Sequence, residues 1–471
     1  MTSAVLPVEL CPKRDYHLSM RNAVFILAVA ALVIPRELIA GNSRSFFLGD
    51  EAALTGGAGI AVSADSGSLW YNPAGLGGLT LGRMELTGTV YSAKLRGLDD
   101  ILVTRIPSGK YTADARADDF GSVPTSLVFV RNGNEKISYG AAWYQTRDSW
   151  LDFRADMQEP YDTEGRVWSE GVEYHQRAYV YHIGPSIGIA LTPRLKIGAS
   201  LYFVYTNFNA SLRAFLGITD PDADPPTDTI VAVSEQYSEM SLGFMVAAGL
   251  QLQLSNRWHM GVVLRTPTFQ VWESVDGSSL DSETAASETE FFSDFNYTTE
   301  EDTRFVFEQT VPMEAQFGVV YRNGDNWIGA EAAVRPPLEA MDQTLLWNAS
   351  IGGRMALTSI VSFGAGIFTD NSSTEKGAVG SLDWKSDRYG FTTGLEFKTP
   401  LIVKGSPEKE GEEKKERSLT WTTTIALSYS FEFAEYNTFD VNSEHTEILT
   451  LPRKDGVFHQ GFVYLGTALY F

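Results

Sequence analysis

Every second side chain between residues 239 and 254 is apolar, and this alternation is the feature that most constrains the fold. One face of the segment carries Met240, Leu242, Phe244, Val246, Ala248, Leu250, Leu252 and Leu254. The other face carries Glu239, Ser241, Gly243, Met245, Ala247, Gly249, Gln251 and Gln253. Successive side chains of a β-strand point to opposite faces, so the segment is predicted to be a strand with one greasy face. It exceeds the ~5–6 residues of a mean strand in soluble proteins, which favours a membrane barrel with a wet lumen over a sandwich.

The same alternation recurs from residue 83 onward and predicts about fourteen strands. Their ranges are 83–93, 124–131, 136–145, 176–191, 194–206, 238–254, 257–271, 303–322, 326–335, 345–355, 359–368, 387–398, 419–433 and 458–471. We therefore predict an all-β fold, a 14-stranded antiparallel transmembrane β-barrel over residues 81–471. Pro312 lies within one range and cannot donate to a ladder, so we expect a bulge or kink there.

The connections between these strands alternate in length. Short links cover residues 132–135, 192–193, 255–256, 323–325 and 356–358, whereas long loops are expected at 94–123, 146–175, 207–237 and 273–302. Short turns at one end and long loops at the other are the layout of outer-membrane barrels. The exception is the link 399–418, which contains the run KEGEEKKER and is expected to be a solvated flexible loop.

An apolar run at residues 23–34 is too short for a membrane helix, which needs ~20 residues. Arg21 precedes the run and small residues follow it, so residues 1–40 are predicted to be a secretory signal peptide, with translation starting at Met20. A buried core helix is the alternative. The single cysteine, Cys11, lies before the run, so no disulfide is expected in the mature chain.

The composition agrees with a barrel in a membrane. Apolar residues make up 44% of the chain and the mean hydropathy is only −0.12, as expected when every second strand residue faces lipid. The formal charge of −22 argues against nucleic acid as a partner. The last segment alternates up to a terminal Phe471, a pattern typical of the sorting signal read by the barrel-insertion machinery. We therefore expect export to a bacterial outer membrane, with the signal peptide cleaved.

Residues 56–78, GGAGIAVSADSGSLWYNPAGLGG, are too rich in glycine and polar residues for a helix or a central strand, yet they carry apolar side chains that require burial. We expect this stretch to fold inside the barrel. It resembles the N-terminal signature of the FadL/TodX family of outer-membrane transporters for long-chain fatty acids and aromatic hydrocarbons. The resemblance is carried by Gly57, Ala58, Asp65, Asn72, Pro73, Ala74 and Gly75. Residues 312–334 and 347–373 resemble two further hairpins of the family.

The resemblance implies that residues 41–80 form an N-terminal plug inside the lumen. It also implies passive uptake of hydrophobic compounds, by capture at outer loops, passage into the plugged lumen and lateral exit through the barrel wall. Gly140 on the third strand is our hypothesis for the wall kink, although a strand glycine can equally serve ordinary lumen packing. Phe291, Phe292 and Phe295 are our hypothesis for a ligand-capture loop, against the simpler interpretation of a solvated tip.

The sequence offers no constellation for catalysis. The six histidines lie apart from one another and from ligand partners at metal-binding spacing, and neither a nucleophile elbow nor a phosphate loop occurs. We expect no enzymatic activity, no metal and no cofactor. The expected partners are a hydrophobic small molecule, outer-membrane lipid and lipopolysaccharide, and the insertion machinery, with a monomeric chain. A non-specific porin and a structural or adhesive surface protein are the alternative functions.

Overall fold

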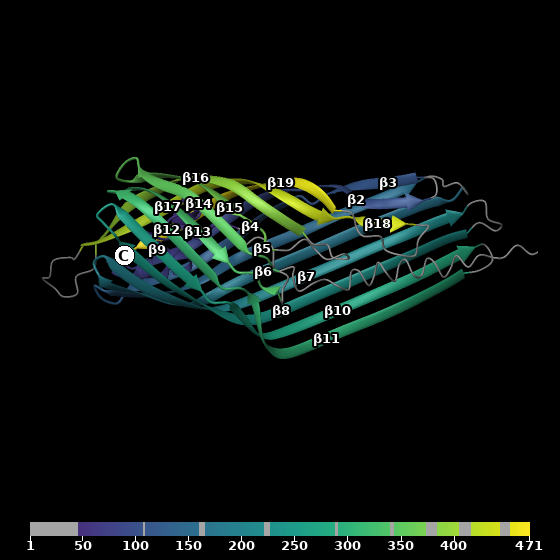
Figure 1. The fold of residues 1–471 in the computed structure, drawn as a ribbon, viewed down its shortest axis with the longest axis horizontal. Coiled ribbons are helices and arrows are strands. Elements are labelled where there is room, and N and C mark those ends of the chain that lie inside the picture. The colour runs from purple at the N-terminus through teal and green to yellow at the C-terminus, as the bar shows by residue number, and fades with distance from the viewer. Residues whose placement is uncertain are drawn as a thin grey trace, which may run out of the picture.

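A computed structural model describes residues 46–106, 109–159, 165–220, 227–287, 291–339, 343–373, 384–404, 416–442 and 453–471. Most of these residues belong to one antiparallel sheet that closes on itself (Figure 1). The ring consists of β1 (Arg83–Leu95), β4 (Asp119–Asn132), β5 (Ile137–Glu159), β6 (Val167–Thr192), β7 (Leu195–Asp220), β8 (Thr227–Gln253), β9 (Trp258–Arg265), β12 (Glu314–Asn323), β13 (Asn326–Arg335), β14 (Leu346–Ala356), β15 (Val361–Asp370), β16 (Trp384–Lys404), β17 (Glu416–Asn437) and β19 (Arg453–Tyr470). Pairing of β1 with β19 and of β8 with β9 completes a ring of fourteen strands. The predicted fold class is confirmed.

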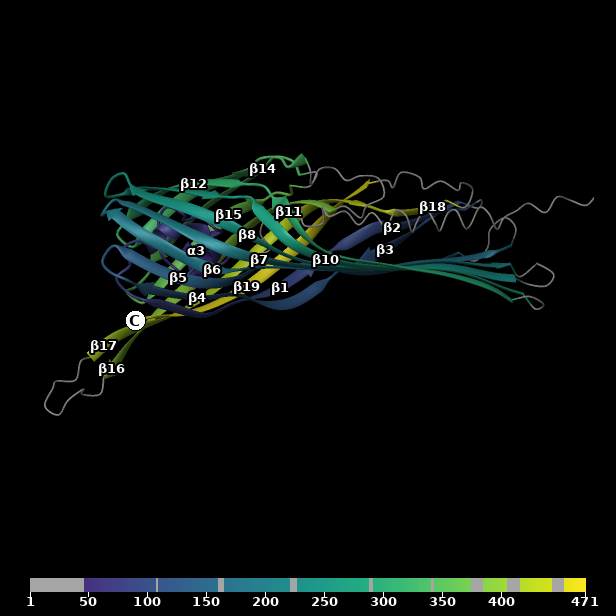
Figure 2. The same ribbon diagram turned by 90° about the horizontal axis from the view of Figure 1, so that it is seen from below.

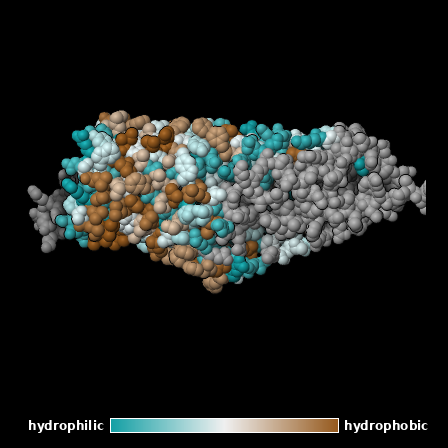
Figure 3. Space-filling model, viewed as in Figure 1, coloured by the Kyte–Doolittle hydropathy of each residue, from teal (hydrophilic) through white to brown (hydrophobic). Residues whose placement is uncertain are grey.

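The ring has an apolar outside and a polar or small-residue inside. Outward-facing side chains include Leu201, Phe203, Leu242, Leu264, Phe317, Ile328, Ile351, Ile367, Leu427 and Leu465, all of them exposed. Figure 3 shows apolar residues gathered over the barrel wall on the face that is seen there. On the predicted strand 239–254, Glu239 is 6% exposed and Leu242 is 46% exposed, as the alternation requires. Among the described residues, no helix has the length and apolar character to cross a membrane.

The hairpin that runs from Trp258 to Asn323 has a break in each of its two strands. β9 ends at Arg265 and continues after two residues as β10 (Thr268–Ser287), while β11 (Phe291–Val311) continues as β12 after Pro312 and Met313. β9 pairs with β12 and β10 pairs with β11, so the two breaks lie side by side. Two prolines, Pro267 and Pro312, remove ladder donors at this level. The kink expected at Pro312 is therefore confirmed.

The expected long loops are in fact paired strands, which corrects the sequence-based assignment. β5 to β8 are 23 to 27 residues long, and β10 and β11 pair up to Ala286 and Phe291. A tilted strand crosses a bilayer in ~9–11 residues. The remaining residues therefore project as a sheet beyond one end of the barrel, called here the long end, which lies at the right of Figure 1. The opposite end, with short links and the C-terminus, is called the turn end.

A second, small sheet lies at the long end. It consists of β2 (Gly97–Ile106), β3 (Gly109–Arg116) and β18 (Phe439–Asn442). Its apolar residues share a core with the projecting strands, made up of Leu98, Ile101, Leu102, Ala115, Ala117, Phe153, Ala155, Val172, Tyr174, Leu212, Ala434, Tyr436, Phe439 and Phe458. The expected loop at 94–123 is therefore largely this hairpin.

The link 399–418 also differs from the expected flexible loop. β16 and β17 stay paired as far as Lys404 and Glu416, so the ends of this segment form a two-stranded ribbon. The ribbon projects beyond the turn end of the barrel, at the lower left of Figure 2. Residues 405–415, which hold most of the charged run, lie outside the described residues.

Candidate functional site

The described part of the N-terminal stretch, Phe46 to Leu79, lies inside the ring and is called the plug. It holds α2 (Asp50–Thr55), α3 (Ser68–Tyr71) and the short 3-10 helix η2 (Pro73–Leu76). Nearly all of its apolar side chains are buried, with Leu54, Leu69 and Leu76 fully enclosed. They share one core with inward residues of β1, β4, β5, β7 and β9. These contacts explain how so irregular a segment is stable: the barrel wall supplies the burial that a helix or sheet of its own would otherwise require.

The Asn72 side chain forms hydrogen bonds both within the plug and to the barrel wall. Its side-chain carbonyl accepts a hydrogen bond from the backbone N–H of Ala74 at 3.1 Å, and so caps η2. Its side-chain amide donates to the backbone carbonyls of Ile60 at 2.8 Å and Leu250 at 3.1 Å. Pro73 follows at the first position of η2, where its missing N–H costs nothing. The motif Asn-Pro-Ala-Gly is therefore a capped turn locked against β8.

Glycines on the lumen side of the wall form a seat for the plug backbone. A Cβ atom at Gly198 would overlap Pro73, one at Gly249 would overlap Asn72, and one at Gly366 would overlap the carbonyl of Thr55. These glycines lie on β7, β8 and β15, so the close approach occurs on opposite sides of the ring. Only a residue without a side chain lets two backbones approach this closely.

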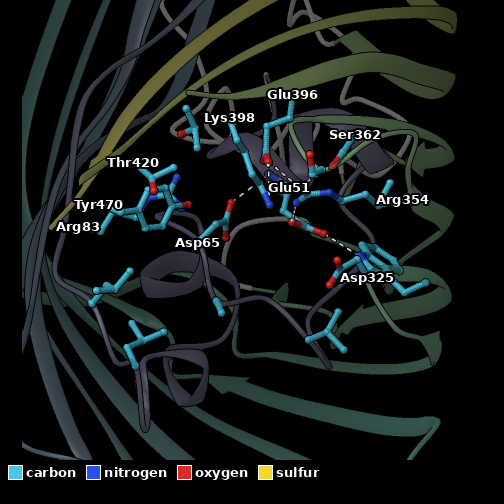
Figure 4. Close-up of a pocket in the computed structure, with 18 of the residues that line it drawn as sticks. Glu51, Asp65, Arg83, Asp325, Arg354, Ser362, Glu396, Lys398, Thr420 and Tyr470 are labelled. Carbon is cyan, nitrogen blue, oxygen red and sulfur yellow. Dashed lines mark hydrogen bonds and ion pairs between the residues drawn. The ribbon is translucent and has the colours of Figure 1, made fainter. Parts of the chain in front are cut away.

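Two ion-pair groups tie α2 to the wall. Asp50 lies 2.9 Å from the Arg83 guanidinium and accepts a hydrogen bond from the Tyr464 hydroxyl at 3.1 Å. Glu51 lies 3.1 Å from Arg354. Arg354 also binds Glu396, as Figure 4 shows. These charges are buried and paired, which is the condition under which charges are tolerated inside a protein.

Between these ion pairs and the turn end of the barrel lies a polar cavity of about 530 Å³. Its lining, drawn in Figure 4, includes Asp65, Asp325, Lys398, Thr420 and Tyr470 beside the two ion-pair groups. Charged and hydroxyl side chains dominate this lining. The cavity therefore suits water and ions and offers little to an apolar molecule.

The other plug residues singled out in the sequence lie in the same body. Asp65 accepts hydrogen bonds from the backbone N–H of Glu51 at 3.0 Å and from the Ser63 hydroxyl at 3.1 Å. Ala58 and Ala74 are buried, and Gly57 has a positive φ of 83°. A Cβ at Gly75 would overlap the Ser63 carbonyl. The structure thus brings all seven signature residues together as packing and turn residues of the plug.

On the long-end side of the plug, the ladder between β4 and β5 is interrupted. The two strands pair only from Ser126↔Tyr144 to Asn132↔Ser138, although β4 continues to Asp119 and β5 to Glu159. On its other side β5 stays paired with β6, with a register shift between Gln145 and Arg147. The edges of β4 and β5 therefore face each other without a ladder for several residues.

A cavity of about 160 Å³ lies in this interruption. Phe46, Val90, Val123 and Phe462 line it from the lumen side, and the outward-facing Trp150 lines it from outside. Polar and charged side chains complete the lining: Ser92, Lys94, Asp119, Ser122, Asp148 and Arg177. The cavity therefore lies between inward-facing and outward-facing side chains of the wall. It is called here the wall passage.

Two basic side chains, Lys94 of β1 and Arg96 directly after it, bridge the interruption. The Lys94 ammonium donates to the backbone carbonyl of Asp148 at 3.3 Å, and the Arg96 guanidinium donates to that of Trp150 at 2.7 Å. Carbonyls at the open edge of β5 are thus satisfied by side chains in place of a neighbouring strand, which removes the cost of unpaired backbone groups. The opening is a built feature of the wall.

The other residues that the sequence singled out do not line this passage. Gly140 pairs with Val130 inside the regular part of the β4–β5 ladder, before the register shift. Residues 291, 292 and 295 lie on the paired strand β11, and the described structure does not cover their side chains. Phe471 follows the end of β19, exchanges backbone hydrogen bonds with Gly82 and packs against Phe129. Among the described residues, no group of three or more His, Cys, Asp or Glu side chains could hold a metal ion.

The fold has solved counterparts. A FadL homologue of Pseudomonas aeruginosa superposes with a TM-score of 0.54 at 14% identity, over 91% of this chain and 99% of the other. The toluene transporter TodX of P. putida superposes with a TM-score of 0.53 at 13% identity, over 90% and 97% of the two chains. This chain has the fold of the FadL and TodX barrels. No protein-family model and no curated protein matches its sequence.

Proposed function

We propose that the protein is an outer-membrane channel for the passive uptake of hydrophobic small molecules, such as long-chain fatty acids or aromatic hydrocarbons. The turn end then faces the periplasm and the long end faces the exterior. The solved barrels that share the fold include a transporter for toluene. The signal peptide at residues 1–40 remains a prediction, because it lies outside the described residues.

The observation that carries the proposal is the wall passage between β4 and β5. An apolar molecule gains nothing by crossing the polar cavity at the turn end, because it would have to be hydrated there. Leaving through the wall takes it past Phe46, Val90, Val123 and Phe462 on the lumen side and then into lipid, although charged side chains also border the passage. The plug supports the same route, because it fills the lumen below the passage.

Capture would occur outside the membrane. A groove of about 320 Å³ lies on the outer face of the projecting sheet, lined by apolar residues that include Phe215, Ala232 and Leu280. Phe215 is 41% exposed and so offers an apolar face to a molecule in the groove. We propose this groove as a first contact for the substrate. The role assigned to Phe291, Phe292 and Phe295 remains a prediction.

Narrowing the wall passage tests the proposal. Gly121 lines the passage, and a Cβ there would meet only ordinary contacts, so Gly121→Trp is expected to fold with an indole ring in the opening. We expect oleate and toluene uptake by cells to fall about tenfold or more, equivalent to ~1.4 kcal/mol in the barrier. Gly461→Trp is the matched control, because Gly461 has open space around its Cβ position and lies outside the passage.

Wild-type uptake by Gly121→Trp would disprove exit through this passage. Equal losses in both variants would show a general folding effect, which the mobility of unheated protein in detergent gels detects separately. The non-specific porin is distinguished by its conductance: it predicts steady ion current through the intact protein in planar bilayers, which a plugged lumen does not allow.

A further inference from the structure

A second groove on the outer face of the projecting sheet begins at Trp150 and Arg177, beside the wall passage, and extends away from it. It has a volume of about 440 Å³ and crosses β5, β6, β7, β8 and β10. Its lining consists of Trp150, His175, Gln176, Arg177, Asn209, Ala210, Ser211, Gln236, Tyr237, Ser238, Asp276 and Ser278. Hydroxyl, amide and charged groups dominate, in contrast to the lipid-facing surface beside it. The groove is called here the headgroup groove.

The register of the strands places this groove directly outside an aromatic belt. Tyr181 stacks on Tyr179 and Tyr205 with ring centroids 6.3 and 6.1 Å apart, and all three point outward on β6 and β7. Tyrosine belts of this kind mark the boundary between acyl chains and headgroups. The next outward-facing position of β6 after Tyr179 is Arg177, which begins the groove. The groove therefore lies at the depth of lipid headgroups.

Arg177 is the fixed cation of the groove. Its guanidinium lies 5.0 Å from the Trp150 ring centroid and 4.5 Å from that of Tyr179. Aromatic faces therefore hold the guanidinium, and the Asp148 carboxylate interacts with it at longer range than an ion pair. A planar guanidinium presented in this way is suited to binding a phosphate.

The rest of the groove suits a sugar. Arg177 pairs with Asn209, Asn209 with Ser238, and Ser238 with Asp276, so one continuous row of polar side chains crosses the sheet. These side chains provide both donors and acceptors, as sugar hydroxyls require. Five strands spaced ~4.8 Å apart give a width of roughly 19 Å. That is too wide for a single phosphate and matches a headgroup of at least two sugar rings.

We propose that the headgroup groove binds the phosphorylated saccharide headgroup of an outer-leaflet glycolipid, with Arg177 on a phosphate and the polar row on the sugars. The acyl chains of the glycolipid then lie on the tyrosine belt, which is continuous with the groove. This inference uses the orientation given by the proposed function, but not the transport itself. Trp150 and Arg177 also line the wall passage, so the bound glycolipid lies beside its outer mouth.

The test uses the full-length protein purified in detergent and native mass spectrometry to count bound lipid. The probes are bis-phosphorylated lipid A, lipid A freed of both phosphates, and phosphatidylglycerol. We expect lipid A to bind most tightly, dephosphorylated lipid A about tenfold more weakly and phosphatidylglycerol more weakly still. Arg177→Gln is expected to weaken lipid A binding about tenfold, the usual scale for one charge-assisted contact. Arg116→Gln, on an exposed arginine paired with Asp118 outside the groove, is the control and should leave binding unchanged.

Unchanged lipid A binding by Arg177→Gln would overturn the proposal, as would equal binding of phosphatidylglycerol and lipid A. If Arg177→Gln does not fold, the double variant Asn209→Ala with Ser238→Ala decides the matter, because both side chains are at the surface of paired strands. It should lose affinity for both forms of lipid A, and wild-type affinity for both would reject the sugar contact. Uptake of oleate by the double variant separates this inference from the transport proposal, because Asn209 and Ser238 line the groove but not the wall passage. Gly121→Trp tests the transport proposal independently.

Discussion

At the scale of single residues, Asn72 joins three parts of the structure. Its three hydrogen bonds connect η2, the turn at Ile60 and the wall at Leu250. Asn72→Ala should destabilise the protein by about 2–4 kcal/mol, since each buried hydrogen bond is worth ~1 kcal/mol and its partners are left unsatisfied. Thermal unfolding and leakage of small solutes from liposomes would measure the effect.

The control for this variant is Asn134→Ala. The Asn134 side chain accepts hydrogen bonds from the backbone N–H groups of Lys136 and Ile137, within an exposed turn between β4 and β5. It should leave leakage unchanged even if stability falls slightly. Leakage as low for Asn72→Ala as for Asn134→Ala would show that the motif has no part in seating the plug.

A pH effect is expected in the small sheet at the long end. Lys454 donates a hydrogen bond to Asp100 at 2.6 Å and so lowers the pKa of that carboxyl below its ordinary value of 3.8. A lowered pKa means that the folded sheet binds fewer protons than the unfolded one. The pair therefore stabilises the sheet above the ordinary pKa, and this contribution is lost as the pH falls through the lowered pKa.

Hydrogen exchange of the β2 and β3 amides, corrected for intrinsic rates, would measure this effect between about pH 5 and pH 2. Protection should decrease toward acid, and only modestly, because the pair is partly exposed. In Asp100→Asn this particular decrease should be absent. An identical pH profile in the two proteins would contradict the assignment.

At the scale of elements, the glycine seat fixes where the plug can lie. Gly198→Ala would place a methyl group against Pro73, and overpacking of this kind typically costs 1–3 kcal/mol. Gly461→Ala provides a matched control, because nothing lies within 4 Å of a Cβ there. We expect Gly198→Ala to raise solute leakage and to expose the plug to protease, and Gly461→Ala to do neither. Equal behaviour of the two variants would contradict a tightly seated plug.

The same scale shows what the sequence could and could not predict. The alternation predicted all fourteen wall strands because lipid imposes a sharp contrast between the two faces within the membrane. Outside the membrane both faces of a strand meet water, so segments such as Thr227–Tyr237 lose the contrast and resemble loops. That is why the projecting strands and the ribbon of β16 and β17 were missed.

The register shift beside the wall passage left a signal in the sequence that the hypothesis at Gly140 did not use. The outward-facing aromatic residues near the start of β5, Tyr139 and Trp143, have odd residue numbers, whereas the outward-facing Trp150 further along has an even one. A change of parity within one strand requires an extra residue, and the register shift lies between Gln145 and Arg147. Gly140 attracted the prediction through its residue type alone. Pairs such as Glu51 with Arg354 left no signal, because they join residues far apart in the chain.

At the scale of the whole molecule, the account requires a lumen closed by its own N-terminal stretch. Deleting residues 46–79 removes the contacts with β7, β8, β14, β15 and β16 that fill the ring. The remaining wall keeps its ladders, so the barrel should still insert while small solutes leak through it. Liposome swelling in sugar solutions measures this leak, with Gly461→Ala as the intact control. A deletion variant that folds and stays impermeable would mean that the plug does not close the lumen.

The most direct test of the central claim is to map the path of an apolar molecule through the intact protein. Cells supplied with a long-chain fatty acid bearing a terminal diazirine would be irradiated, and the adducts located by mass spectrometry of the purified protein. The account predicts adducts on the residues of the wall passage, notably Val123 and Trp150, and none on Thr420 or Lys398 in the polar cavity at the turn end. Adducts concentrated in that cavity, with the passage unlabelled, would contradict exit through the wall.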